Sequence, residues 1–238
     1  MANGLTSAGR IADPADRVNG LFSERIRQNF EIFSYRNAAA ILSAGFPEQF
    51  ADICAALDRF SITKTMIRQP GGNKGPIAKY VDTLFGNEWV ETRISADLKV
   101  KLLDANKQDH VLSEYTREGY LDGHRIDFVN GKVALDLEWN SKDQTYDRDL
   151  YAFSAFYDAG AIDVGVIITR GSSLDTDYFR SLGTVLKKDG TEGKKDVYEK
   201  FGASTTWMDK LLYRLDAGRN GGCPVLAFGI KPDCVEDR

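Results

Sequence analysis

The segment HRIDFVNGKVALDLEW, from His124 to Trp139, limits the fold of this chain more than any other part of the sequence. Its Asn130-Gly131 pair lies between two runs rich in β-branched and apolar residues, which is the strongest short-range signal for a β-hairpin. A hairpin here places Asp127 on the first strand and Glu138 on the second.

Side chains along the second strand of this hairpin are expected to alternate between two faces. One face would carry Val133, Leu135 and Leu137, and the other would carry Ala134, Asp136, Glu138 and Asn140. The first face predicts a contact with the core, whereas the second gathers acidic groups.

The residues after the hairpin indicate how it joins a larger sheet. Residues 143–159 have apolar positions at helical spacing, and AIDVGVIITRG at 161–171 is typical of a strand buried on both faces. A strand, a helix and a strand at this spacing predict a parallel crossover. With strand-like residues at 91–104 and 225–230, the sequence predicts an α/β fold with a mixed central β-sheet flanked by helices.

Two regions precede this core. Residues 1–20 lack sustained apolar periodicity and are expected to form a flexible leader. Residues 21–86 show helical patterns, with Pro47 and Pro76 near two helix starts. We therefore expect one domain over 21–238, with a helical part at about 21–86 and a catalytic core at about 90–238.

Charge limits the kind of nucleic-acid contact that the chain can make. The 31 Lys and Arg against 35 Asp and Glu give a net charge of −4, which argues against a passive nucleic-acid coat. Any DNA contact must be locally basic. The lysine-rich segment at 187–200 is either a solvated loop or a weak candidate for phosphate contact.

Cysteine usage and hydropathy indicate the compartment. The three cysteines form no CxxC pair and are odd in number, so they suggest neither a zinc site nor a disulfide framework. The sequence lacks a run of roughly 18 apolar residues and a secretory signal. We expect a cytoplasmic protein that has no membrane contact.

Two carboxylates brought together across a hairpin are what a divalent-metal phosphodiesterase needs. Mg²⁺ prefers oxygen ligands, and it is usually coordinated by one or two carboxylates, several waters and a phosphate oxygen. Asp127 and Glu138 are the candidate ligands, with the backbone carbonyl of Trp139, and Asn140 is a candidate to orient the attacking water. The alternative is that both carboxylates are ordinary solvated residues near a turn; the acidic crowding of one strand face favours a cation.

The same residues resemble a known nuclease motif. Asp127, ten intervening residues and Glu138-Trp139-Asn140 are similar to the PD-(D/E)XK pattern, with Ile126 in place of its proline. The longer segments DGHRIDFVNGKVALDLEWNSKDQTYDRDLYAF, GASTTWMDKLL and GRNGGCPVLAFGI resemble the BglII/BstYI family of type II restriction endonucleases. The resemblance extends from roughly Asn29 to Ile230.

This resemblance implies a restriction-endonuclease-like core and a prokaryotic homodimer that encloses duplex DNA. It implies Mg²⁺-dependent cutting, with Mn²⁺ able to substitute, at a short palindrome with a GATC-like core, leaving 5′-phosphate ends. A cognate DNA methyltransferase is expected in the same restriction-modification system. Asn140 stands where the wider superfamily has lysine, and because an amide supplies no positive charge, more activation would fall to the metal.

Further residues are candidates for contacts with DNA or metal. Ser141 and Lys142 directly follow the catalytic strand, and the hydroxyls of GASTTW lie at a probable helix start, where capping is the alternative role. Arg214 and Arg219 are candidates for guanine or phosphate contact. The full set of DNA-contact candidates is Ser141, Lys142, Ser204, Thr205, Thr206, Arg214 and Arg219. The superfamily often adds an upstream acidic residue on a helix, for which Glu114 and Glu118 are candidates, and His124 is a weaker candidate for a general base.

Three other functions remain open from the sequence. A repair or junction-resolving nuclease could share the same core but would cut according to DNA structure. The missing lysine also allows a catalytically silent DNA-binding protein. A nucleotide-using metabolic enzyme is disfavoured because no GxGxxG follows a strand and the GGNKG run at 71–75 lacks P-loop spacing.

Overall fold

A six-stranded mixed sheet forms the centre of the protein in a computed structural model that describes residues 11–71 and 74–237. The strands lie in the order β1 (Phe30–Tyr35), β9 (Val225–Ile230), β6 (Val164–Arg170), β5 (Val133–Glu138), β4 (His110–Asn130) and β3 (Val90–Asp104). The neighbours β5, β6 and β9 are parallel, while β1, β4 and β3 pair antiparallel. The predicted mixed central sheet is confirmed.

The hairpin predicted around Asn130-Gly131 joins β4 to β5. Asn130 pairs with Val133, so the two residues of the turn are Gly131 and Lys132. Gly131 has a φ of 58°, a conformation that favours glycine because it has no Cβ. The turn therefore lies one residue later than the sequence signal, and both strands form as predicted.

The parallel crossover is also present. Helix α7 (Thr145–Asp158) connects β5 to β6, and Leu135 pairs with Val166 in the parallel register. Gly165 of β6 lies directly against the ring of Phe153, where a Cβ would collide with it. This close approach seats the middle of α7 on the sheet.

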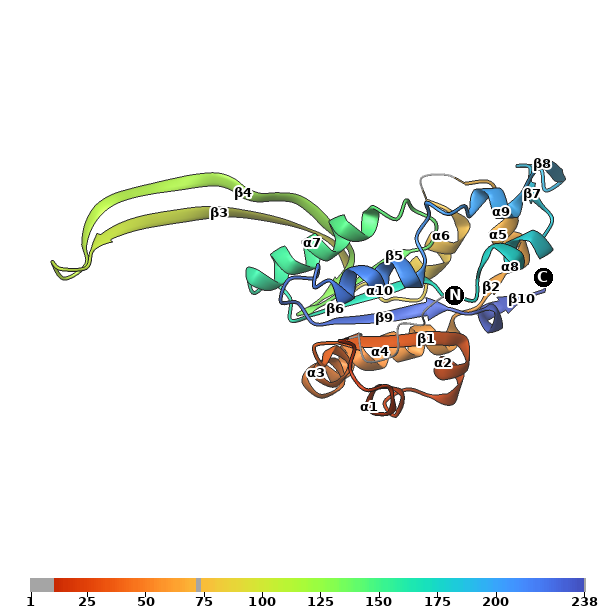
Figure 1. Ribbon diagram of the computed structural model, residues 1–238, viewed down its shortest axis with the longest axis horizontal. Helices are drawn as coiled ribbons and strands as arrows, with labels where there is room; N and C mark the ends of the chain where they lie inside the picture. The colour runs from red at the N-terminus through yellow and green to blue at the C-terminus, as the bar shows by residue number, and fades with distance from the viewer. Residues whose placement is uncertain (1–10, 72–73, 238) are drawn as a thin grey trace, which may run out of the picture.

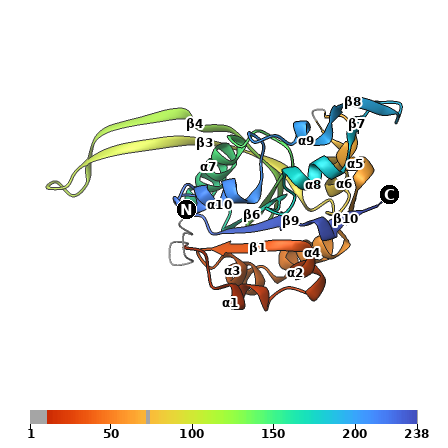
Figure 2. The ribbon, with the colours of Figure 1, turned by 45° about the vertical axis from the view of Figure 1, so that its right-hand side comes forward.

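Helices cover both faces of the sheet, as Figures 1 and 2 show. On one face, α2 (Glu24–Asn29), α3 (Ala38–Gly45) and α4 (Pro47–Arg59) pack against the odd-numbered side chains of β5. On the other face, α7 and α10 (Met208–Asp216) pack around Ala134 and Ile167. The two predicted faces of β5 thus point into two different layers of the core.

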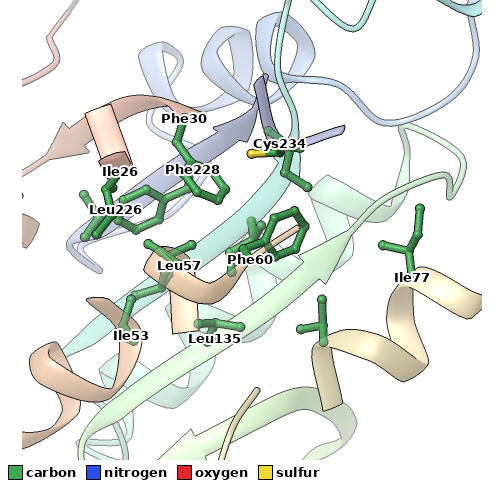
Figure 3. Packing of buried hydrophobic residues seen from close by; sticks show 14 of the residues in the cluster. Ile26, Phe30, Ile53, Leu57, Phe60, Ile77, Leu135, Leu226, Phe228 and Cys234 are labelled. Atoms are coloured by element: carbon green, nitrogen blue, oxygen red, sulfur yellow. The ribbon is translucent and has the colours of Figure 1, made fainter. Parts of the chain in front are cut away.

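The larger core cluster joins residues that are distant in the chain. Figure 3 shows Phe30 and Phe228 from adjacent strands beside Leu57 of α4 and Leu135 of β5. The rings of Phe30 and Phe228 meet edge to face with centroids 6.1 Å apart. These contacts hold the N-terminal helices to the catalytic half of the sheet.

Shorter elements complete the chain. They are α1 (Ala15–Asn19), β2 (Ile62–Thr63), α5 (Lys64–Arg68), α6 (Pro76–Asp82), α8 (Thr176–Ser181), β7 (Thr184–Leu186), β8 (Glu192–Asp196), α9 (Val197–Lys200), the 3-10 helix η2 (Pro232–Cys234) and β10 (Val235–Glu236). The lysine-rich segment at 187–200 is therefore ordered as part of the β7–β8 hairpin and α9 rather than as an irregular loop.

The N-terminal part differs from the expectation in two ways. The predicted helix through Phe30 stops at Asn29, and the alternating residues FEIFSY form β1, because the edge of β9 offers them a partner strand. Within the expected leader, residues 1–10 lie outside the described residues, whereas α1 is helical and buries Val18 in the core. The packed part of the chain thus begins before residue 21.

Strands β3 and β4 extend beyond the body as a long two-stranded ribbon, here called the arm and defined as residues 95–125 (Figure 1). None of its residues is buried. Exposed apolar side chains in the arm include Leu102, Leu112 and Tyr115. Strand β4 continues unbroken from His110 to Asn130, so the residues beyond Glu114 are part of the strand.

Candidate active site

A cleft of about 880 Å³, here called the main cleft, brings the predicted catalytic residues together. Asp127, Glu138, Trp139 and Asn140 all line it, with Ser141 beside them. A smaller hollow of about 270 Å³, the side recess, shares Glu91, Asp127 and Glu138 with the main cleft. Asp127 and Glu138 therefore lie where both hollows meet, together with Glu91.

Asp127 is held by the backbone of the neighbouring strand. The Leu137 amide donates to Asp127 Oδ2 at 3.3 Å, and the Asp127 amide donates to Asp136 Oδ1 at 2.8 Å. Solvent reaches Asp127, yet the walls of the cleft desolvate its carboxylate and raise its pKa above the usual value, with Asp149 adding to the effect. A nearby cation would relieve this.

Glu138 ends β5 and is buried, with 6% of its surface exposed. Thr145 Oγ1, at the start of α7, donates to its Oε2 at 3.2 Å. Burial, followed by the charge of Asp149, raises the pKa of Glu138 to about 8. At neutral pH this carboxyl group therefore keeps its proton unless a positive charge comes close to it.

Two further carboxylates, Asp136 and Asp149, adjoin this pair and were not among the predicted site residues. Burial raises the pKa of both, and for Asp136 the charge of Asp149 is the next cause. Asp149 could have been found from the sequence, because it falls within the buried stripe of α7 formed by Tyr146, Leu150 and Phe153. A charged residue in an apolar stripe is unusual, because burying a charge is costly unless the charge is paired.

Arg148 supplies the positive charge closest to this cluster. Its Nε and Nη2 donate to Asp149 Oδ1 at 3.0 and 2.9 Å, and Nη2 lies 3.7 Å from Glu138 Oε1. Its side chain is 63% exposed and lines the side recess. The guanidinium thus spans two acidic groups while it faces solvent.

Asn140 and Trp139 lie on the wall of the main cleft. Asn140 Nδ2 donates to the carbonyl of Lys200 at 3.4 Å, while its Oδ1 is buried and has no hydrogen-bond partner among the described residues. The Trp139 ring meets Phe201 edge to face, with centroids 5.9 Å apart. Asn140 Oδ1 is therefore an unsatisfied acceptor that solvent does not reach in this structure.

The residues present fit a magnesium ion better than a protein-saturated metal centre. Among the described residues, no group of three or more His, Cys, Asp or Glu side chains has the geometry to hold a metal. Mg²⁺ commonly uses only one or two carboxylates and completes its shell with waters and phosphate oxygens. Asp136 Oδ2, buried without a partner in this part of the chain, adds to the local negative charge that such an ion would neutralise.

Two of the predicted DNA-contact segments lie side by side although 62 residues separate them in sequence. Lys142 and Thr205 form an antiparallel bridge, and the Thr206 amide donates to the Ser141 carbonyl at 2.9 Å. Lys142 and Ser204 are exposed, whereas Thr206 is buried. The juxtaposition depends on tertiary structure, so no local sequence signal could have shown it.

Arg214 and Arg219 converge on one acidic residue of α7. Arg214 Nε and Nη2 donate to the two carboxylate oxygens of Asp147 at 3.0 and 2.9 Å, and Arg219 Nη1 donates to Oδ1 at 2.5 Å. Arg214 is buried, whereas Arg219 is exposed. In this structure, therefore, only Arg219 of the two presents its guanidinium at the surface.

The other candidates lie outside the carboxylate cluster. The upstream acidic residue sought on a helix is not found at Glu114 or Glu118, because both stand on the exposed β4 strand of the arm, and Glu114 pairs with Lys99 and Lys101. His124 lines the side recess, and its ring meets that of Tyr151 edge to face.

No helix in the described part of the chain is long and apolar enough to cross a bilayer.

Comparison with known families gives the site its context. The family model described as restriction endonuclease BglII/BglIII matches residues 30–230. The chain belongs to this family. As a BglII-family member, the chain is a type II restriction endonuclease, a class of site-specific deoxyribonucleases that act on duplex DNA. No curated protein gives a significant match.

Proposed function

We propose that this BglII-family endonuclease uses Mg²⁺ to hydrolyse both strands of DNA at a short palindromic site, with Asp127, Glu138 and Asn140 at the reaction centre. The observation that carries the proposal is the meeting of Asp127 and Glu138 at the junction of the two hollows. Both carboxylates have raised pKa values, as expected where a cation is missing from an acidic cluster.

The chemistry follows from these groups. Asp127, Glu138 and the Trp139 carbonyl would hold the ion, which supplies a water of lowered pKa and neutralises charge on the phosphate. Asn140 Oδ1 lacks a hydrogen-bond partner among the described residues, and it would orient that water once the side chain turns toward the cleft. Water oxygen bonds to phosphorus as the P–O3′ bond breaks, and the departing oxygen takes a proton. The products are a 5′-phosphate and a 3′-hydroxyl.

DNA would enter along the surface that leads from the main cleft to the bridged segments. Ser141 lines the cleft, and Lys142 and Ser204 are exposed beside it, so they are the better placed of the proposed DNA contacts. Arg219 is placed to reach DNA only if it leaves Asp147. Thr205, Thr206 and Arg214 are engaged or buried within the protein, so their proposed role requires a rearrangement on binding.

Cutting both strands of a palindrome requires two copies of one active site, related by a two-fold axis. We accordingly propose a homodimer, a GATC-like core in the recognition site, a prokaryotic cytoplasmic location and a cognate methyltransferase. Sedimentation of the purified protein, alone and with a palindromic duplex, tests the dimer. A monomer with and without DNA would contradict it.

The function is tested by incubating the purified protein with phage DNA and Mg²⁺ or Mn²⁺. Discrete fragments that disappear with EDTA are expected, and sequencing their ends would give the site and the cut position. Asp127→Asn and Glu138→Gln should abolish cutting. Asp122→Asn is the matched control, because Asp122 lies on the same strand but pairs with Arg93 outside both hollows.

The alternatives predict other products. A structure-specific repair nuclease would cut branched or damaged DNA and leave ordinary duplex intact. A catalytically silent protein would bind duplex DNA without cutting it at any metal concentration, and Asp127→Asn would change only the electrostatic part of binding. Either result would contradict the restriction proposal.

A further inference from the structure

The reaction centre of this chain needs a fixed positive charge from somewhere other than β5. Asn140 stands at the strand position where the PD-(D/E)XK motif has lysine, and an amide carries no charge. Phosphodiester hydrolysis concentrates negative charge on the phosphate oxygens, and fixed cations close to that charge stabilise it. The cations around the two hollows are therefore the groups to compare.

Three of the four cations that line the hollows are engaged elsewhere. In the main cleft, Lys74 pairs with Asp82, and Lys200 Nζ donates to the backbone carbonyls of Ile67 and Gln69 at 2.9 and 2.7 Å. In the side recess, Arg125 pairs at 3.3 Å with Glu91, which lines both hollows. Of these three cations, Lys74 lies close enough to Asp127 for its charge to lower the pKa of that carboxyl group.

Arg148 is the cation of this group that contacts the cluster. Its Nη2 bridges Asp149 Oδ1 at 2.9 Å and Glu138 Oε1 at 3.7 Å. Asp149 is 2% exposed and Glu138 6% exposed, whereas the arginine side chain is 63% exposed. One end of the guanidinium is thus anchored on buried acid groups while most of it faces the recess.

Helix α7 fixes the place of Arg148. Its neighbours in sequence are held on either side, because Asp147 binds Arg214 and Asp149 is buried against β5. The ring of Phe153, one turn further along, lies against Gly165 of β6. Arg148 is therefore presented from a rigid element, as a group that must meet a phosphate at a set position should be.

We propose that Arg148 is the resident cation of the cut site: it is held by Asp149 and Glu138 in the metal-free enzyme, competes with the incoming ion for Glu138, and then contacts the scissile phosphate. This inference rests on the proposed function. The planar guanidinium suits such an exchange, because it donates several N–H bonds to either carboxylate or phosphate oxygens. Arg148 is then a catalytic residue supplied by a helix.

Two measurements on Arg148→Gln separate the halves of the proposal. In calorimetric titration of the DNA-free protein with Mg²⁺ and Mn²⁺, the variant should bind the ion several-fold more tightly, because a competing charge is gone. In single-turnover cutting with saturating metal, the same variant should be about 100-fold slower. Opposite changes in metal affinity and rate are the signature of the proposal.

Arg93→Gln is the matched control. Arg93 is a 53% exposed arginine paired with Asp122, so it resembles the Arg148–Asp149 pair but lies outside both hollows. Its metal affinity and cutting rate should equal those of the unmodified protein. Arg148→Lys keeps the positive charge but lacks the planar guanidinium. Its metal affinity should equal that of the unmodified protein, and its cutting rate should lie between those of Arg148→Gln and the unmodified protein.

The outcomes are distinguishable. Unchanged or weaker metal binding in Arg148→Gln, or a cutting rate equal to that of Arg93→Gln, would overturn the role of Arg148 while leaving the nuclease proposal intact. A protein that binds metal but cuts no DNA would overturn the proposed function, and the metal titration would still test the competition with Glu138. If Arg148→Gln does not fold, the cutting rates of Arg148→Lys and Arg93→Lys are compared instead, and a rate for Arg148→Lys equal to that of Arg93→Lys would overturn the role of Arg148.

Discussion

At the scale of single residues, the buried carboxylates couple stability to pH. Glu138 has a folded-state pKa of about 8 against an ordinary value of 4.5, so the folded protein holds a proton that the unfolded chain releases earlier. An acid with a raised pKa contributes its full stability below the unfolded value and loses it as pH rises through the folded value. Asp136 and Asp149 shift in the same direction.

We therefore expect the free energy of unfolding of the metal-free protein to fall between pH 4.5 and about pH 8. The contribution of Glu138 to the slope should be roughly 1 kcal/mol per pH unit. Urea unfolding across this range measures it, and Glu138→Gln should flatten the curve. Asp122→Asn should leave the slope in this window unchanged, because the pKa of Asp122 is lowered by Arg93. A curve for Glu138→Gln as steep as that of the parent would contradict this.

The two arginines on Asp147 should differ in their effect on stability. Arg214 is 10% exposed and makes two hydrogen bonds to Asp147, so Arg214→Met should lower the free energy of unfolding by about 1–3 kcal/mol. Arg219 is 43% exposed, and Arg219→Met should cost no more than about 1 kcal/mol. Chemical denaturation of the two variants side by side measures the difference, and equal losses would refute the distinction.

At the scale of the elements, α7 shows what the sequence could and could not predict about the site. The hairpin carboxylates and the crossover helix follow from local patterns, because a strand alternates its faces and a helix repeats every few residues. The contact of Arg148 with Glu138 depends on how α7 is rotated about its own axis relative to β5. The packing of Phe153 against Gly165 sets this rotation, and the sequence spacing alone does not reveal it.

The arm is the element least supported by the rest of the fold. A ribbon in which Leu98 pairs with Arg117, but with no buried residue from 95 to 125, adds little to the core. Replacing residues 99–116 by Asn-Gly should therefore move the Tm by no more than about 2 °C. Scanning calorimetry is the measurement.

Phe128→Ala is the contrasting variant, because Phe128 lies in the core at the base of the same strand and its ring meets that of Phe85 at a tilt, with centroids 4.9 Å apart. It should cost about 3 kcal/mol or more. If shortening the arm lowered the Tm as much as Phe128→Ala does, the apolar side chains of the arm would have to be buried in solution.

At the scale of the whole molecule, the layered architecture was predictable and two long-range features were not. Apolar runs gave β6 and β9, and the turn signal gave β4 and β5, because each pattern is local. Strand β1 was missed because its partner is 190 residues or more away, at Val225–Ile230. The bridge between Lys142 and Thr205 was not predicted either, because its two residues are also far apart in the sequence.

Metal binding should stabilise the molecule as a whole. An ion that binds only the folded state adds about 2.7 kcal/mol at a free concentration about 100 times its dissociation constant, which corresponds to a rise in Tm of roughly 5–10 °C. Differential scanning fluorimetry with Mg²⁺ and Mn²⁺ measures the rise. It should vanish in Glu138→Gln and persist in Asp122→Asn, and a rise that survives in Glu138→Gln would place the ion elsewhere.

The exposed arm should unfold locally far more often than the core does. Since no residue of the arm is buried, its interstrand amides are protected from exchange with deuterated solvent mainly by strand pairing. They should exchange from the tip at Gln108 and Asp109 inward, through local fraying, while the amides of β5 and β6 wait for global unfolding. Amide exchange should thus be fast in the arm and slow in the strands beneath the carboxylates.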